Sequence, residues 1–329
     1  MKGIPMSKAI RFHTTGGPEV LVLEDVAVGA PGPLEAQVRH SACGINFVDC
    51  YQRSGLYQVP LPSGAGGEGA GVVVAVGAGV TAFKPGDRVA YAGGAPGAYC
   101  ELRNLPADRL CLLPEGISFE QGAAMMLKGM TVQYLIRRTH RVAAGETVLF
   151  HAAAGGVGLI ACQWLKALGA TVIGTAGSEE KCRLALEHGA DHCINYRTED
   201  FAARVRELTG GEGVPVVYDS VGRDTFPGSI ACLRPLGLMG SFGNASGPVP
   251  AMELSVLASH GSLFLTRPTL NTYTARRADL EATARDLFDV VLSGQVKIGI
   301  GRRYALKDAA QAHRDLESRG TTGASILVP

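Results

Sequence analysis

The chain has 329 residues, of which 46% are hydrophobic and 19% are charged. This length is typical of two domains, and the hydrophobic content provides for packed cores and excludes a disordered chain. The 31 basic and 30 acidic residues give a formal net charge of +1, and neither sign forms a long run. The composition therefore offers no support for binding to nucleic acid or to a membrane surface.

No apolar stretch approaches the roughly 20 residues that a membrane-spanning helix requires, and residues 1–6 lack the apolar core of a secretion signal. The eight cysteines include no Cys-x-x-Cys pair, so we expect reduced packing residues and neither a disulfide framework nor a zinc cluster. The expectation is a soluble, cytoplasmic protein.

The first part of the chain, up to about Pro114, is predicted to be rich in β-structure. Its expected strands cover residues 21–23, 36–39, 71–76 and 88–91. Short strands separated by turns are typical of a barrel or sandwich.

From Ser118 onward the pattern changes to alternating helices and strands. Helices are expected at 119–138, 156–168, 178–188, 199–208 and 224–233, and strands at 147–151, 171–174, 191–194, 214–218, 236–242 and 262–266. Such alternation predicts an α/β fold with βαβ units, in which a doubly wound parallel sheet has helices on both faces. A helix at 278–292, a strand at 296–300, a helix at 307–318 and a strand at 325–328 complete the prediction, and we expect these last strands to return to the first region.

The segment 148–160 is the most informative part of the chain. An apolar strand ends at small residues, and a helix begins near Gly156 in a variant of the G-x-G-x-x-G spacing that places Gly155, Gly156 and Gly158 at the turn. The free N–H groups and the dipole of such a helix bind a dinucleotide pyrophosphate. A tight turn without a ligand is the alternative, but the flanking strands and helix favour the nucleotide.

The next strand indicates which nucleotide is bound. NAD enzymes usually carry an acidic residue about 20 positions after the glycines, to bind the ribose 2′-hydroxyl. Here the chain reads Gly174-Thr-Ala-Gly-Ser178-Glu179-Glu180-Lys181. Lys181 offers a charge for a 2′-phosphate, which favours NADPH over NADH. The alternative is a solvated surface lysine, and Glu179 and Glu180 must point away from the phosphate.

Several blocks together resemble one family, the zeta-crystallin type of quinone oxidoreductase in the medium-chain dehydrogenase/reductase superfamily. They are residues 16–20, 43–49, 53–57, 84–89, 127–131, the glycine turn through Gln163 and Lys166, 218–222, 241–244 and 266–268. The resemblance implies a GroES-like β-barrel catalytic domain at 1–127, a Rossmann NADPH domain at 128–268, and a segment at 269–329 that returns to the catalytic domain. It also implies a homodimer and NADPH-dependent reduction of a quinone in the interdomain cleft.

The chain departs from the zinc-dependent alcohol dehydrogenases of the same superfamily at two positions. Asn46 stands where they have a zinc-binding cysteine, and Gly67, before Glu68, stands where they have a histidine. Catalytic zinc needs about three protein ligands, so we expect no metal. A quinone is then a suitable acceptor, because it can take a hydride without a Lewis acid.

The resemblance also assigns site residues. It places Asn46, Thr131, Phe242, Gly243 and Arg267 near the nicotinamide; Gly155, Gly156, Val157 and Gly158 at the pyrophosphate; and Ser178, Lys181, Tyr196 and Arg319 at the 2′-phosphate; Ala154, Gly174, Ser220 and Thr266 are further cofactor-binding residues. For Tyr196 the alternative is ordinary packing at a strand end.

Asn46, Tyr51 and Arg267 are the candidate catalytic residues. Tyr51 could donate a phenol proton to the reduced acceptor or serve only as an aromatic spacer, and water could supply the proton instead. Asp49 could also line the acceptor pocket. His151, inside the first strand of the nucleotide domain, is expected to be buried and neutral.

Two other functions stay open. An NADPH-dependent reductase of enones or enoyl thioesters would use the same fold, since these acceptors are also conjugated carbonyl compounds. A non-catalytic NADPH-binding protein, crystallin-like or RNA-binding, is the third possibility, although no basic patch with interleaved aromatic residues supports it. The identity of the acceptor, and whether it takes one electron or two, do not follow from the sequence.

Overall fold

The structure of the chain is a computed structural model that describes residues 6–329, and its fold divides into two units. Unit 1 contains the residues up to Met130 together with Thr274–Leu292 and Ile298–Pro329, and unit 2 contains Thr131–Tyr273 and Ser293–Lys297. Residues 1–5, most of the segment in which the sequence shows no secretion signal, lie outside the described residues. None of the described helices is long and apolar enough to cross a membrane.

Unit 1 is built around two sheets. The three-stranded sheet has the order β2-β1-β4, formed by β1 (Met6–Phe12), β2 (Val22–Ala27) and β4 (Ser63–Gly64). The seven-stranded sheet has the order β15-β16-β3-β5-β6-β8, with β7 paired to β3. Its strands are β3 (Glu35–Ile45), β5 (Glu68–Val76), β6 (Arg88–Ala92), β7 (Leu102–Pro106), β8 (Cys111–Leu112), β15 (Ile300–Ala305) and β16 (Ala324–Val328).

The strands near the end of the chain complete the larger sheet. β16 runs antiparallel to β3, with Ser325 opposite Ile45 and Leu327 opposite Cys43, and parallel to β15. β3 is therefore held on both sides, and it leads directly into α1 (Phe47–Ser54). Helices α9 (Arg277–Leu292) and α10 (Ala309–Glu317) also belong to this unit.

The predicted strand at 296–300 was wrong, because strand pairing starts only at Ile300. The main chain of Lys297 makes its hydrogen bonds with a side chain instead. Gln163 donates from Nε2 to the Lys297 oxygen at 3.1 Å and accepts from the Lys297 N–H at 2.8 Å. The amide of Gln163 thus takes the place of a neighbouring strand, while Val296 is buried.

Unit 2 contains a six-stranded sheet of parallel strands with the order β11-β10-β9-β12-β13-β14. The strands are β9 (Thr147–Phe150), β10 (Thr171–Ala176), β11 (His192–Asn195), β12 (Val214–Asp219), β13 (Leu233–Ser241) and β14 (Phe264–Thr266). This is the Rossmann order, in which the chain moves outward from β9 in both directions. The predicted α/β fold with a parallel sheet is confirmed.

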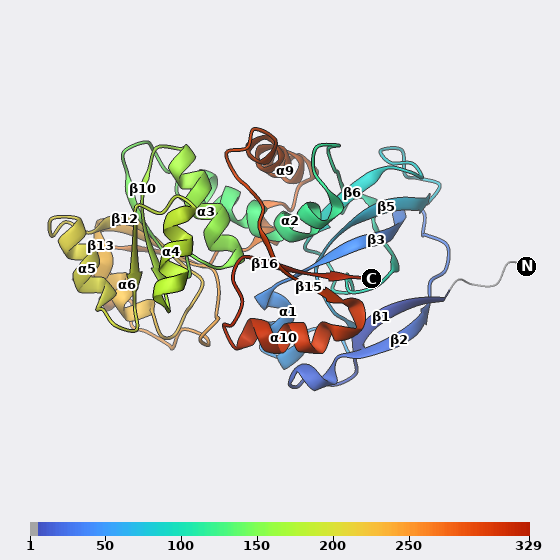
Figure 1. Ribbon diagram of the computed structural model, residues 1–329, viewed down its shortest axis with the longest axis horizontal. Helices are drawn as coiled ribbons and strands as arrows, with labels where there is room; N and C mark the ends of the chain where they lie inside the picture. Colours follow the sequence, from blue (N-terminus) through green and yellow to red (C-terminus); the bar gives the residue numbers. More distant parts are fainter. Residues whose placement is uncertain (1–5) are drawn as a thin grey trace, which may run out of the picture. The chain divides into compact units, whose positions relative to one another are not determined.

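The helices of unit 2 cover both faces of this sheet, because right-handed crossovers in opposite directions from β9 place them on opposite sides. They are α3 (Gly156–Ala167), α4 (Glu179–Glu187), α5 (Phe201–Leu208), α6 (Phe226–Cys232), α7 (Ser255–Ser259) and α8 (Leu270–Tyr273). α3 and α4 lie side by side on β10, whereas α5 and α6 pack together with α6 on β12 and β13 (Figure 1). α2 (Phe119–Tyr134) precedes them and ends in a π-helical turn.

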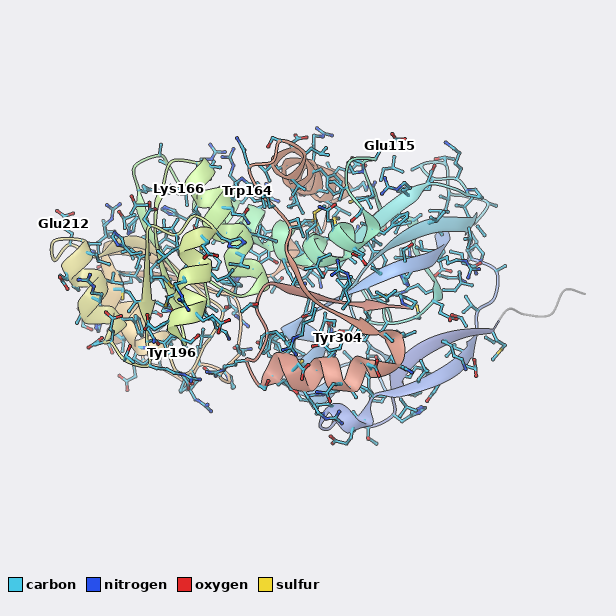
Figure 2. All side chains as sticks on the ribbon, in the orientation of Figure 1. Glu115, Trp164, Lys166, Tyr196, Glu212 and Tyr304 are labelled. Carbon is cyan, nitrogen blue, oxygen red and sulfur yellow. The ribbon has the colours of Figure 1, made fainter. Side chains whose placement is uncertain are left out.

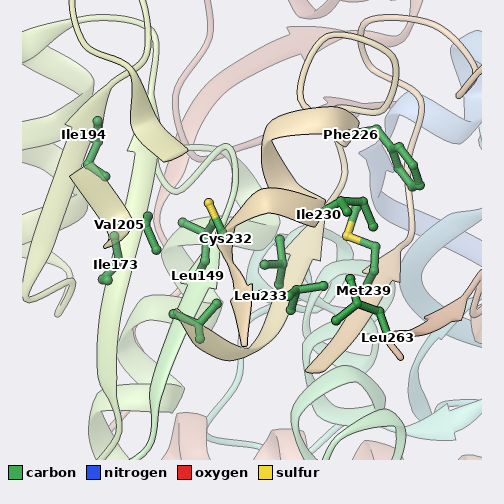
Figure 3. Packing of buried hydrophobic residues seen from close by; sticks show 12 residues of the cluster. Leu149, Ile173, Ile194, Val205, Phe226, Ile230, Cys232, Leu233, Met239 and Leu263 are labelled. Atoms are coloured by element: carbon green, nitrogen blue, oxygen red, sulfur yellow. The ribbon is translucent and has the colours of Figure 1, made fainter. Parts of the chain in front are cut away.

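An apolar cluster fills one side of this sheet. Figure 3 shows Ile173 and Leu149 from the central strands packed with side chains of α5 and α6, among them Val205 and Ile230. These residues are almost completely removed from water, and burying each contributes about 1.5–3 kcal/mol. This packing stabilises the sheet and so holds the loops that follow its strands.

Candidate nucleotide and acceptor sites

The carboxyl ends of the parallel strands of unit 2 lie along one edge of the sheet. All but one of the predicted nucleotide-site residues of this unit lie on or just after these ends. Ala154 to Gly158 follow β9, Gly174 and Ser178 belong to β10 and its turn, Lys181 lies in the first turn of α4 just after it, Tyr196 follows β11, Ser220 follows β12, Phe242 and Gly243 follow β13, and Thr266 and Arg267 end and follow β14. The exception is Thr131 on α2, which hydrogen-bonds Tyr134. This edge, next to the switch point between β9 and β12, is where such folds bind ligands.

The glycine turn after β9 brings the start of α3 close to the strand. A side chain at Gly158 would overlap the main-chain oxygens of Ala152 and Ala153. Gly155 is the N-cap residue of α3 and makes no side-chain cap, so the first N–H groups of the helix remain available to an anion. Gly174 on β10 is required for a similar reason, since its Cβ would lie 2.7 Å from the Cβ of Ala153.

The turn after β10 contains Ser178 and Lys181. Ser178 is the N-cap residue of α4, and its hydroxyl oxygen accepts from the Lys181 N–H at 3.3 Å. The carboxylate of Glu179 is occupied by the side-chain amide of Asn195, whose Nδ2 donates to it at 2.7 Å. Glu180 is exposed. Of the two acidic residues in this turn, Glu179 is thus paired with a neutral donor.

Tyr196 lies beside the same turn, because a Cβ placed on Gly177 would be 2.6 Å from its hydroxyl oxygen. Figure 2 shows Tyr196 at the opposite end of the α3–α4 layer from Lys166, which lies in the last turn of α3. Arg197 reaches the same place, with its Nε 3.6 Å from that Cβ position. Arg197 is a candidate phosphate ligand that the sequence reasoning missed, although its position next to Tyr196 could have indicated it.

The loops after β12, β13 and β14 are tied together. Gly243 packs so tightly on the main chain of Ser220 that no side chain would fit there. Arg267 donates from Nη1 to the main-chain oxygens of Ser241 at 2.8 Å and Gly243 at 3.3 Å. Phe242 donates its N–H to the Asp219 oxygen at 2.8 Å. Arg267 therefore fixes the loop that carries Phe242 and Gly243.

A buried polar network lies under this edge. His151 is contacted by the hydroxyl of Thr175 at Nδ1 (2.8 Å) and by that of Ser229 at Nε2 (2.9 Å), and Ser229 donates to the Asp219 carboxylate at 2.9 Å. Burial lowers the pKa of His151, and a neutral imidazole satisfies both contacts. The expected burial of His151 is confirmed, and the lowered pKa favours the expected neutral ring.

In unit 1, the side chain of Asn46 is part of a second buried network. Its Nδ2 donates to Glu68 Oε2 at 2.8 Å, and the same oxygen accepts from Lys128 Nζ at 3.2 Å. The other oxygen of Glu68 accepts from the Leu127 N–H at 2.7 Å. All three polar side chains are buried, Glu68 completely. Sequence reasoning missed Lys128 and the role of Glu68, because no local pattern links positions 46, 68 and 128.

Asp49, on the first turn of α1, holds the main chain of Asn46. Its Oδ2 accepts from the Asn46 N–H at 2.8 Å and from the Tyr99 hydroxyl at 2.8 Å, and the Tyr99 hydroxyl also contacts His313 Nε2 at 3.2 Å. Burial raises the pKa of Asp49 to about 7 and lowers the pKa of His313 to about 3. Oδ1 of Asp49 is buried without a hydrogen-bond partner, which adds to the cost of ionising this carboxyl.

The remaining predicted residues of unit 1 have different surroundings. The Tyr51 ring contacts the rings of Tyr57, edge-on at 5.2 Å between centroids, and Phe47 at 6.2 Å. Tyr51 is thus one member of an aromatic group that follows Asn46. Arg319 follows α10 in a left-handed backbone conformation.

The residues around Asn46 do not fit a catalytic zinc ion. Within residues 6–329, no group of three or more histidine, cysteine, aspartate or glutamate side chains could hold a metal. Both oxygens of Glu68 are taken by N–H donors, and the Lys128 ammonium lies where it would repel a cation. Asn46 and Gly67 supply neither the thiolate nor the imidazole that zinc prefers.

Two family models match the chain. An alcohol dehydrogenase GroES-like domain matches residues 32–147, and a domain described as a zinc-binding dehydrogenase matches residues 156–289.

Known proteins match nearly its whole length. A quinone oxidoreductase of Pseudomonas aeruginosa is 56% identical over 325 residues, which are 98% of this chain and 100% of the relative. A solved structure of Escherichia coli quinone oxidoreductase complexed with NADPH is 52% identical, has a TM-score of 0.97, and is matched over 98% of this chain and 100% of that chain. A 2-haloacrylate reductase of Burkholderia sp. is 44% identical over 98% of this chain and 99% of the relative.

Proposed function

Because the chain belongs to the quinone oxidoreductases of the medium-chain dehydrogenase/reductase superfamily, we propose that it oxidises NADPH and reduces a quinone without a metal ion. The observation that carries this proposal is the network around Asn46 in unit 1, which has no place for zinc, and the glycine turn after β9 in unit 2 supports it. The E. coli relative whose structure contains NADPH supports the choice of cofactor.

The residues of unit 2 fit NADPH. The N–H groups at the start of α3, beside Gly155 and Gly156, would hold the pyrophosphate. Ser178, Lys181 and Tyr196, with Arg197, would hold the 2′-phosphate, because a phosphate needs charged and hydroxyl donors. When bound, NADPH supplies the hydride.

The site residues of unit 1 would act on the nicotinamide and the acceptor. Asn46 offers an amide that donates and accepts without a net charge, and Tyr51 lies in the aromatic group after it. A quinone gains aromaticity on reduction, so it needs no Lewis acid. The contribution of this chain is to hold donor and acceptor carbons about 3.5 Å apart.

The test is a spectrophotometric assay of NADPH oxidation by chelator-treated enzyme. We expect turnover with benzoquinones and naphthoquinones, none with alcohols, and no loss after chelation. Turnover that disappears with chelator and returns with zinc would contradict the proposal.

Tyr51→Phe distinguishes the two roles of Tyr51: proton donation predicts a kcat loss of about 100-fold, whereas an aromatic spacer predicts little change.

Reduction of a carbon–carbon double bond conjugated to a carbonyl is the second candidate. The 44% identity to a 2-haloacrylate reductase favours it. The same assay with enones and 2-haloacrylate decides between the two, since a higher kcat/KM for these acceptors than for any quinone would make this the main activity.

We also propose a homodimer in a cytoplasmic setting. β14 is an edge strand, and Phe264 (60% exposed) and Leu265 (40%) on it, with Leu254 (77%) nearby in the chain, present apolar surface. Exposed apolar edges of this kind pair with a second copy. Phe264→Lys is expected to convert a dimer to a monomer in sedimentation analysis.

The eight cysteines, all within residues 6–329, form no disulfide, which supports the proposed cytoplasmic setting because that compartment is reducing.

A further inference from the structure

We propose that Lys128 and Glu68 are positioning residues that fix the orientation of the Asn46 side-chain amide. This inference rests on the proposed function, in which Asn46 contacts the reacting nicotinamide or the acceptor. The proposal rests on the hydrogen bonds of one carboxylate. Glu68 is completely buried and accepts from the Asn46 amide, the Lys128 ammonium and a main-chain N–H.

The orientation of a side-chain amide depends on whether its partner donates or accepts. Glu68 is paired with the Lys128 ammonium, and an ionised carboxylate can only accept hydrogen bonds. Asn46 must therefore turn its NH₂ group toward Glu68, and its oxygen faces another direction. Without Lys128, the carboxylate of Glu68 loses the partner of its charge, and its hold on the NH₂ group of Asn46 weakens.

The main chain supports the same arrangement. Asp49 accepts from the Asn46 N–H at 2.8 Å, so Asn46 is held at the N-terminus of α1 by one carboxylate and at its side chain by another. Gly44 makes room for this, because a side chain there would overlap both Glu68 Oε2 and the Ala123 main-chain oxygen. Gly44 therefore allows α2, which carries Lys128, to approach β3.

A buried ion pair is a poor source of stability, because the cost of removing two charges from water offsets their attraction. Lys128 and Glu68 are both buried, with side-chain exposures of 6% and 0%. Stability alone gives little reason to bury them. The positioning of Asn46 gives such a reason, because an ionised carboxylate can accept only from the NH₂ end of the amide.

The test uses Glu68→Gln, Lys128→Met and their double variant. The amide introduced by Glu68→Gln has one acceptor and one donor group, so it can pair with Asn46 in either orientation. We expect kcat to fall about 10- to 100-fold in each variant, while the dissociation constant for NADPH changes by less than about threefold, because unit 2 supplies most of the binding groups. Lys128→Met leaves Glu68 without its cation and lowers the Tm. The double variant is expected to recover this Tm but not kcat.

A merely structural role predicts a different pattern, in which kcat recovers together with the Tm in the double variant. That result would overturn the proposal. Asn46→Ala/Glu68→Gln gives a second criterion: if Glu68 acts through Asn46, the double variant is no slower than Asn46→Ala, and multiplied losses would contradict the proposal. Glu317→Gln is the matched control, since it breaks the ion pair with buried Arg53 in the same unit and is expected to lower the Tm with kcat unchanged.

A measurement on nucleotide-free protein separates this proposal from the proposed function. The chain contains five asparagines, so selective ¹⁵N labelling of asparagine side chains gives few NH₂ signals, and Asn46→Ala identifies the one from Asn46. We expect this signal to move or broaden in Glu68→Gln and Lys128→Met but not in Glu317→Gln. An unchanged signal would refute the positioning role even in an active enzyme. If the wild-type enzyme oxidised no NADPH in the presence of any quinone, the proposed function alone would fail.

Discussion

The two units build their candidate sites from different chemical groups. The edge of unit 2 uses the main chain: glycines allow the start of α3 to lie close to β9, and Arg267 holds a loop by its carbonyl oxygens. The network of unit 1 uses buried side chains around Asn46, with Glu68 and Asp49 as acceptors. A main-chain site suits any dinucleotide phosphate, whereas a side-chain network can set the orientation of a single reacting group.

The largest expected effect compares a glycine from each site. Gly44→Ala and Gly158→Ala both place a methyl group against main-chain oxygens, and each is expected to lower the free energy of unfolding by about 3 kcal/mol. Urea denaturation measures this. Gly158→Ala should also abolish NADPH binding in fluorescence titrations, while folded Gly44→Ala should retain it and lose turnover.

Gly67→Ala is the matched control for this pair. A Cβ at Gly67 meets nothing within 4 Å, so the free energy of unfolding should change by less than about 0.5 kcal/mol. If Gly44→Ala were as stable as this control, the close packing around Glu68 would not exist. If Gly44→Ala also lost NADPH binding, the two sites would not be independent.

The second prediction concerns pH and tests the side-chain network. Burial lowers the pKa of His313 to about 3, below the value of about 6.5 in an unfolded chain. The neutral ring therefore stabilises the fold above pH 6.5, and this contribution is lost as the pH falls toward 3. Between pH 7 and pH 4.5 the loss is about 2.5 kcal/mol. His313→Gln, which cannot take up this proton, should show a smaller drop in urea titrations by that amount.

Asp49 acts in the opposite direction. Its pKa is raised to about 7, above the unfolded value of about 3.9, so its contribution to stability is complete below pH 4 and is lost as the pH rises through 7.

An identical pH dependence of wild type and His313→Gln would mean that His313 ionises freely in the folded protein.

The smallest expected effect concerns the phosphate side of unit 2. Lys181→Ala should raise the dissociation constant for NADPH about tenfold, equivalent to about 1.4 kcal/mol, and leave that for NADH unchanged. Arg197→Ala, at a more exposed position, should raise it about threefold. Isothermal titration with both cofactors measures this. Equal weakening of NADH binding by Lys181→Ala would show that the lysine does not contact the 2′-phosphate.

The sequence predicted the fold of unit 2 and its glycine turn better than it predicted the side-chain network of unit 1. The glycines of the turn after β9 and the alternating elements leave a local pattern, so the fold, the glycine turn and the burial of His151 were correctly expected. Residues 46, 68, 99, 128 and 313 meet only through β-strand pairing and helix packing across long stretches of chain. Such contacts leave no periodic pattern in the sequence. The strand expected at 296–300 failed for the same reason, because a distant side chain, Gln163, replaced its pairing partner.

The pairing of β16 with β3 has a consequence for how the protein folds during synthesis. β3 leaves the ribosome long before β16, and unit 2 lies between them in the chain. Unit 2 can therefore fold while unit 1 is still missing a strand, and the sheet whose strand β3 leads to Asn46 closes only after a contact of very high sequence separation forms, which is slow. A nascent chain arrested before Ala324 should accordingly resist proteolysis within residues 131–273 and be cut within β3.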